Sequence, residues 1–285
     1  MSNDQSSSSM PAPWEPSPPP YSEHETRVPT EHVPQYEAPH WNTSTGDSTR
    51  LQAATKKFPP ALNGYFQWRN LTREFHLGPA GSEKLFSMSL QVEHRKSKQT
   101  MILRNGPTEQ DPPLALMESD AYLRAKPVTI TILPQTGSHE SPIVEPFEGF
   151  VPYKRISPTF SIAVGGTGKD AHCEKFQWRS SHGKEIKELG GYSSGWKLVR
   201  LSHTVGETSA SRSERTVGCS SDGREIVAVV AHNASWSLTK GFRFAFLGSG
   251  LTGILGEDWE TMAVITAVHI WLVDFQVMTN MVPIT

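Results

Sequence analysis

The sequence predicts a mainly β fold, in which a closed β-barrel or wrapped sheet encloses a single hydrophobic helix near the C-terminus. Two observations predict it. The segment from Trp259 to Val273 places apolar residues at every angle around a helical axis, and a helix that is hydrophobic all round must be covered on every side. The residues before it read as short strands separated by turns. The simplest cover is therefore a sheet that curls around the helix.

Residues 1–55 are predicted to form a disordered tail. They are nearly all Ser, Pro, Thr, Glu and Gln, and such a composition cannot bury enough apolar surface to offset the entropy lost on folding. The tail contains the string Pro18-Pro19-Pro20-Tyr21. Proline-rich segments pre-form the extended helix that WW domains bind in aromatic grooves. Pro18, Pro19 and Tyr21 are therefore candidate WW-domain ligands, with a plain proline-rich spacer as the alternative.

Residues 56–279 are predicted to form one compact domain that begins with a series of short strands. In the clearest of them, three apolar residues alternate with two threonines, as a half-buried strand requires. The candidate strands are Leu85–Val92, Thr100–Leu103, Val128–Ile132, Thr159–Val164, Glu174–Arg179, Gly195–Leu201, Glu225–Val230 and Phe242–Leu247. The stretches Pro134–Pro158 and His203–Asp222 are rich in turn residues and are predicted to be surface loops.

The central helix is predicted at about residues 257–276. Its predicted core residues are Trp259, Met262, Ile270 and Trp271. A membrane span is the rival interpretation. The apolar run Thr261–Val273 would be about 20 Å long, whereas the hydrocarbon core of a bilayer is about 30 Å thick. The acids before this run suit the positive end of the helix dipole. The sequence therefore favours a buried core helix and no transmembrane segment.

Charge and cysteine content bear on partners and location. Residues 56–243 carry 25 Lys and Arg against 18 Asp and Glu, a balance of +7, although the whole chain is at −2. This balance permits attraction to anionic surfaces. Cys173 and Cys219 are the only cysteines, and no secretory leader pattern is present, so a reducing, cytoplasmic location is the default expectation. We expect no cofactor, no metal and no nucleic-acid partner.

One string raises the alternative of a serine hydrolase. Residues 191–195 match G-x-S-x-G, in which Ser193 would be the nucleophile. Asp222 and either His232 or His269 follow in the order that such enzymes use. The segment after the motif, however, alternates like a strand, whereas the nucleophile motif leads into a helix. A non-enzymatic protein is therefore the favoured interpretation, and a serine hydrolase using Ser193 is the alternative.

Two glycine-rich strings resemble nucleotide-binding motifs. Residues 248–253 match G-x-G-x-x-G, but the acid at the right distance, Asp274, ends a helix rather than a second parallel strand. These glycines are expected to make the sharp turn from barrel wall to central helix. Residues 165–169 resemble a phosphate-binding loop but lack its first glycine at the proper spacing. Neither string therefore predicts a nucleotide site.

A set of short strings in the second half of the chain carries a family resemblance. They are FQWR at 176–179, LGG at 189–191, GWKLVRL at 195–201, GREIVAVV at 223–230, SLTK at 237–240, FLGSG at 246–250 and GE-x-W-x-x-MAVITA at 256–267. In this order they resemble fungal members of the tubby C-terminal-like superfamily, which includes LURP-one-related and phospholipid-scramblase-like proteins. The resemblance runs from about Phe66 to Asp274. It implies a closed, roughly twelve-stranded β-barrel around a hydrophobic C-terminal helix.

The resemblance also implies a link to phospholipids, because tubby proteins bind phosphoinositide headgroups through basic residues. Their headgroup motif matches no segment of this chain. A separate cluster, Arg95, Lys96 and Lys98, lies between two predicted strands and is expected to project from a hairpin tip. Each base there could contribute about 1 kcal/mol near an anionic bilayer, and a merely solvated loop is the alternative. We therefore expect a non-enzymatic binding or adaptor protein at the membrane periphery.

Overall fold

The computed structural model divides the chain into two units, Met1–Thr49 and Arg50–Thr285. The residues that it describes all belong to the second unit. They are 57–66, 74–120, 128–135, 140–149, 157–165, 171–189, 194–204, 218–232 and 240–279. The predicted tail of residues 1–55, with Pro18, Pro19 and Tyr21, lies outside the described residues, and so does Ser193.

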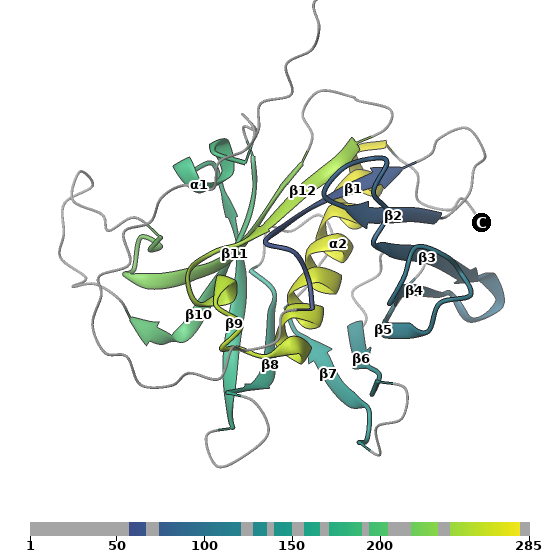
Figure 1. The fold of residues 1–285 in the computed structure, drawn as a ribbon, viewed down its shortest axis with the longest axis horizontal. Coiled ribbons are helices and arrows are strands. Elements are labelled where there is room, and N and C mark those ends of the chain that lie inside the picture. Colours follow the sequence, from purple (N-terminus) through teal and green to yellow (C-terminus); the bar gives the residue numbers. More distant parts are fainter. Residues whose placement is uncertain are drawn as a thin grey trace, which may run out of the picture. The chain divides into compact units, whose positions relative to one another are not determined.

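Twelve antiparallel strands form one sheet that curls almost completely into a barrel (Figure 1). The strands are β1 (Ala61–Phe66), β2 (Glu74–Gly78), β3 (Phe86–Glu93), β4 (Lys98–Arg104), β5 (Pro113–Asp120), β6 (Val128–Ile132), β7 (Ile143–Phe147), β8 (Thr159–Val164), β9 (His172–Ser181), β10 (Gly195–Thr204), β11 (Arg224–His232) and β12 (Lys240–Phe246). Their order across the sheet is β7-β6-β5-β4-β3-β2-β1-β12-β11-β10-β9-β8. The sheet is thus two runs of sequential strands joined where β1 pairs with β12.

The two outer strands, β7 and β8, meet at a single bridge. Glu148 and Thr159 exchange two backbone hydrogen bonds of 2.8 Å each, and beyond this pair the strands separate. Backbone N–H groups along an antiparallel strand point alternately to its two neighbours. The next residue of β7 that should donate to β8 is therefore Pro146, which has no N–H. The barrel consequently has one weakly closed seam.

The helix α2 (Glu257–Thr279) runs through the middle of the curled sheet (Figure 1). Trp259, Met262 and Ile270 are fully buried, and Trp271 is 4% exposed. The sheet and helix are also joined by a buried hydrogen bond from Trp178 Nε1 to Thr266 Oγ1, at 3.0 Å. The predicted mainly β barrel around an apolar helix is therefore confirmed.

The helix is longer than the apolar run from which it was predicted. It has 23 residues, and the stretch Glu257–Val277 is long and apolar enough to cross a membrane by length and composition. Length therefore does not separate a core helix from a span in this chain. Burial favours a core helix, because 83% of the apolar window is enclosed by the rest of the domain.

The glycine-rich string at residues 248–253 forms the turn from barrel wall to helix. It begins with a 3-10 turn, η3 (Gly248–Leu251), that directly follows β12. A β-carbon on Gly250 would lie 2.3 Å from the Val227 carbonyl oxygen and 2.8 Å from the Trp259 ring, so no larger residue fits there. The turn therefore serves close packing of the helix against the wall.

The eight strands predicted from sequence are all present, whereas four further strands were not predicted. β1 contains an Asn-Gly pair that is typical of turns. Gly64 is nevertheless required inside this strand, because a β-carbon there would lie 2.1 Å from the Phe242 ring. β5 begins with proline, β2 is short, and β7 lies within Pro134–Pro158, which was wrongly predicted to be a loop throughout. Local turn signals in these segments are outweighed by pairing with neighbouring strands.

Candidate functional site

The basic residues predicted to form a headgroup site lie together at the tip of the β3–β4 hairpin. The tip is a 3-10 turn, η2 (His94–Lys96), followed by Ser97 in the left-handed backbone region at φ 52°. Arg95 and Lys96 belong to η2, and Lys98 begins β4. The hairpin thus brings all three predicted residues to one exposed turn.

Two of these three bases form ion pairs with neighbouring acids. Lys96 Nζ lies 2.9 Å from Glu93 Oε1, and Lys98 pairs with Glu118 across the β4–β5 ladder. All four side chains are substantially exposed, and ion pairs of this kind contribute only about 0–1 kcal/mol. Within the described part of the chain, Arg95 has no acidic partner. The tip therefore carries one free cation and two weakly held ones.

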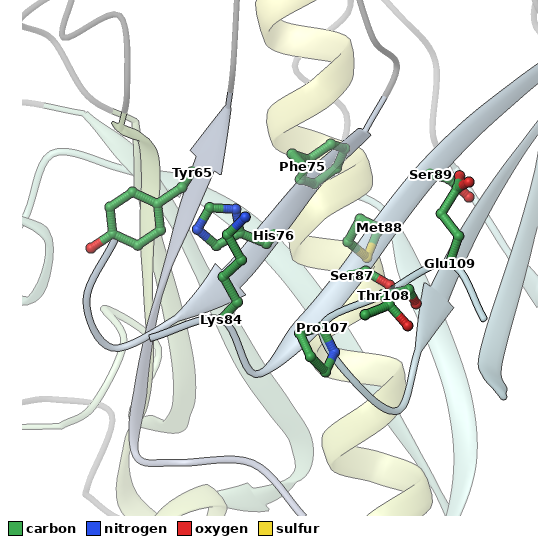
Figure 2. Close-up of a pocket in the computed structure, with 10 residues that line it drawn as sticks. All are labelled: Tyr65, Phe75, His76, Lys84, Ser87, Met88, Ser89, Pro107, Thr108 and Glu109. Carbon is green, nitrogen blue, oxygen red and sulfur yellow. Dashed lines mark hydrogen bonds between the residues drawn. The ribbon is translucent and has the colours of Figure 1, made fainter. Parts of the chain in front are cut away.

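A second candidate site lies on the outer face of the barrel. A hollow of about 160 Å³ opens there between β2, β3 and the connection that joins β4 to β5. Figure 2 shows the side chains around it. They are Tyr65, Phe75, His76, Lys84, Ser87, Met88, Ser89, Pro107, Thr108 and Glu109. Sequence reasoning missed this site because its residues come from four separate segments that carry no shared motif.

The β4–β5 connection is held firmly across β3, so the hollow is already formed. The Ser87 N–H donates to the Gly106 carbonyl at 2.6 Å, and the Ser87 hydroxyl donates to the Thr108 carbonyl at 2.8 Å. Arg104 donates to the Glu109 carbonyl at 2.9 Å and to Ser89 Oγ at 3.1 Å. Because these bonds fix the rim before any ligand arrives, little ordering cost remains for binding.

His76 is the most unusual residue of the hollow. Its side chain is only 9% exposed, and its ring stacks on Tyr65 with centroids 5.2 Å apart. Burial lowers the pKa of His76, the positive charge of Lys84 lowers it further, and a hydrogen bond to the Gly81 backbone offsets part of this shift. His76 Nε2 is buried without a hydrogen-bond partner in the described structure. An imidazole whose neutral form is favoured thus lines the hollow, while its unpartnered nitrogen is covered.

A buried ion pair lies near the turn that leads into α2. Arg200 donates two hydrogen bonds to the Glu174 carboxylate, one of them from Nε to Oε2 at 2.6 Å. Ser202 also donates to this carboxylate. The hydrogen bond from Arg200 holds the pKa of Glu174 at about 2, against the opposing effect of burial. Arg200 Nη1 also lies 3.7 Å from Glu225, whose carboxylate accepts from the backbone and side chain of Ser249. This network ties β9, β10 and β11 to η3.

The residues proposed to assist Ser193 do not gather with one another. Asp222 is held by Arg179 and Arg224, with Arg179 Nη1 at 2.8 Å. His232 lies 3.5 Å from a different acid, Asp274. His269 is in the core, where burial lowers its pKa to about 4. The structure thus gives each candidate a separate environment.

Metal ligands do not cluster in the residues described above. No group of three or more His, Cys, Asp or Glu side chains there could hold a metal ion. Cys173 and Cys219 are both free thiols.

Comparisons with known proteins give no family for this chain. No family model matches it, and neither the curated proteins nor the solved structures contain a significant match.

Proposed function

We propose that this chain is a non-enzymatic binding protein of the tubby C-terminal-like superfamily that associates peripherally with anionic phospholipid membranes in the cytoplasm. Its architecture, a twelve-stranded barrel around an apolar helix, is the one that the sequence resemblance implied. The observation that carries the membrane proposal is the exposed basic tip of the β3–β4 hairpin. The two free thiols suit a reducing compartment.

The hairpin tip can bind lipid phosphate at little cost. Arg95 is exposed and has no ion pair to lose in the described structure. The acids that hold Lys96 and Lys98 are themselves exposed, so the lysines can exchange them for phosphate oxygens with small losses. Each base near an anionic bilayer then contributes about 1 kcal/mol.

Replacing Arg95 by Glu should weaken binding to anionic vesicles by roughly thirtyfold, because one attraction of about 1 kcal/mol is exchanged for a comparable repulsion, a total change of about 2 kcal/mol. The triple change of Arg95, Lys96 and Lys98 to Glu should abolish binding. The measurement is co-flotation with phosphoinositide-containing liposomes at low and physiological salt, since exposed charge interactions weaken with salt.

The matched control for Arg95→Glu is Lys187→Glu, which makes the same change of net charge on the exposed face of the short helix α1 (Lys184–Lys187). This variant should float like the wild type. Equal flotation of Arg95→Glu and the wild type would show that the tip is not the membrane site, and equal losses in both variants would show that only net charge matters.

We further propose that the tail recruits WW-domain proteins through Pro18, Pro19 and Tyr21, which makes the protein an adaptor between a membrane and a second protein. The string Pro18-Pro19-Pro20-Tyr21 supports this proposal because it has the composition that WW grooves bind. Replacing Tyr21 by Ala should abolish capture of the full chain by immobilised WW domains. Tyr36→Ala, which changes another tail tyrosine outside the motif, is the control. Retention of both variants would rule the motif out.

A further inference from the structure

We propose that the hollow beside His76 binds a small zwitterion, one that carries an oxyanion and a primary ammonium group. This inference is independent of membrane binding by the hairpin tip, because it rests on different residues at the other end of β3 and β4. It follows from the hydrogen-bonding capacity that the hollow leaves unused, from its two opposite charges and from its size.

The hydroxyl groups in the hollow mostly offer lone pairs. Ser87 donates its only hydroxyl proton to the Thr108 carbonyl at 2.8 Å, and Thr108 donates its own to Asp111 Oδ2 at 2.7 Å. A hydroxyl that has used its proton can only accept. The hydroxyl oxygens of Ser87 and Thr108 can therefore accept hydrogen bonds from donor groups of a ligand.

The imidazole of His76 forms one wall of the hollow. A neutral imidazole has one N–H and one lone pair, and the hydrogen bond to the Gly81 backbone takes one of its two nitrogens. The remaining nitrogen, Nε2, is buried and has no partner among the described residues. Because this nitrogen is covered by neighbouring atoms, it is not open to a ligand, and the imidazole serves as a flat wall that stacks on Tyr65.

Two opposite charges lie on different sides of the hollow. Figure 2 shows Lys84 extending toward His76 and Glu109 on the far side, next to Ser89. Neither side chain makes an ion pair or side-chain hydrogen bond with any other residue that the structure describes. Lys84 thus offers a site for an oxyanion, and Glu109 offers one for an ammonium group. The two ends of a zwitterion match this arrangement.

The size of the hollow restricts the ligand further. Its volume of about 160 Å³ is below the roughly 300–1,000 Å³ of sites that hold drug-sized molecules. A ligand of a few heavy atoms fits. The same chemistry occurs in free metabolites and in ethanolamine-type lipid headgroups, so the two sources must be separated by experiment.

Isothermal titration calorimetry of the full chain with three probes tests the chemistry. O-phosphoethanolamine has both charges and N–H donors, phosphocholine has both charges without N–H donors, and inorganic phosphate has only the oxyanion. We expect O-phosphoethanolamine to bind at least about tenfold more tightly than the other two, because only it satisfies the acceptors. Absence of binding, or equal binding of phosphocholine or phosphate, would overturn the proposal.

Substitutions locate the site. Lys84→Met and Glu109→Gln should each weaken O-phosphoethanolamine binding about tenfold, and both side chains are exposed, so the fold should tolerate the changes. Lys187→Met and Glu188→Gln change the same residue types at two exposed positions on and beside α1, and they should leave the affinity unchanged. Unaltered binding by the first pair, or equal losses in both pairs, would refute the site.

The imidazole signals of His76 give a direct readout. In ¹H–¹⁵N spectra they should shift on titration with O-phosphoethanolamine, and the titration midpoint should move to about tenfold higher concentration in Glu109→Gln. Binding without any shift at His76 would contradict the assignment.

Vesicles of neutral phosphatidylcholine, with and without phosphatidylethanolamine, then identify the source of the ligand. Co-flotation only with the ethanolamine lipid identifies a headgroup, and its absence, alongside binding of the soluble probe, identifies a free metabolite.

Discussion

Replacing Trp271 by Ala should lower the free energy of unfolding by about 3–5 kcal/mol, and replacing it by Asp should prevent folding. Trp271 is 4% exposed and lies against three aromatic rings. Its centroid distances are 5.6 Å to Phe75, 5.0 Å to Phe242 and 5.7 Å to Phe275. Gly241 makes room for the indole, because a β-carbon there would lie 2.5 Å from it. Truncation therefore opens a cavity that rigid strands on two sides cannot fill.

Chemical denaturation followed by circular dichroism measures this effect. Ile254→Ala is the matched control, since this side chain is 47% exposed in the turn before the helix and should cost little. A soluble Trp271→Asp domain that unfolds cooperatively near the wild-type midpoint would show that the helix is not enclosed.

The second large effect is expected at the buried pair of Arg200 and Glu174. Arg200→Met should cost about 3–5 kcal/mol, because it leaves the buried Glu174 carboxylate without its guanidinium and with only Ser202 and His172 as hydrogen-bond partners among the described residues. Glu174 is only 4% exposed, so water cannot replace the guanidinium. The double variant Glu174→Gln/Arg200→Met should recover part of the loss, since it removes the buried negative charge that Arg200 had balanced. Equal stability of the single and double variants would contradict this explanation.

The same pair predicts how stability depends on pH. The pKa of Glu174 falls from an ordinary 4.5 to about 2 in the fold, chiefly through the Arg200 hydrogen bond. A lowered carboxylate pKa stabilises the folded state fully above the unfolded value, and this contribution is lost as pH falls through the folded value. Wild-type stability should therefore decline between pH 4.5 and 2. In Arg200→Met this acid-side decline should shrink or change sign, as melts over this pH range would show.

The barrel could be predicted from sequence because its defining signal is local. A helix without a polar face must be covered on all sides, and this can be recognised from the helix sequence alone. Strands such as Val128–Ile132 show the alternation of apolar and polar residues that is typical of a sheet with one buried face. Strands β1 and β7 could not be predicted, since each contains a residue that normally breaks strands. Gly64 is explained only by the Phe242 ring across the ladder, and Pro146 only by its position at the seam.

Of the two candidate sites, one could likewise be predicted from the sequence and the other could not. The hairpin tip was predictable because Arg95, Lys96 and Lys98 are close in sequence and lie between two recognisable strands. The hollow was not predictable, because His76 and Glu109 belong to no sequence motif and line the same hollow only because the β4–β5 connection folds back across β3. Bonds such as Arg104 to the Glu109 carbonyl depend on the folded backbone. Short-range clusters are therefore visible in a sequence, whereas sites assembled across strands are not.

The pairing of β1 with β12 has a consequence for synthesis on the ribosome. One edge of β1 pairs with β12, which begins at Lys240. This edge therefore stays unpaired from the time Phe66 leaves the ribosome until β12 has been synthesised. At roughly 5 to 20 residues per second, this wait is on the order of ten seconds or more. Throughout it, the concave face of the growing sheet lacks α2, which is made last, and an open apolar sheet edge invites wrong pairing. A stall before β12 should thus leave an aggregation-prone nascent chain, so the final forty residues of the described domain decide whether the earlier ones stay soluble.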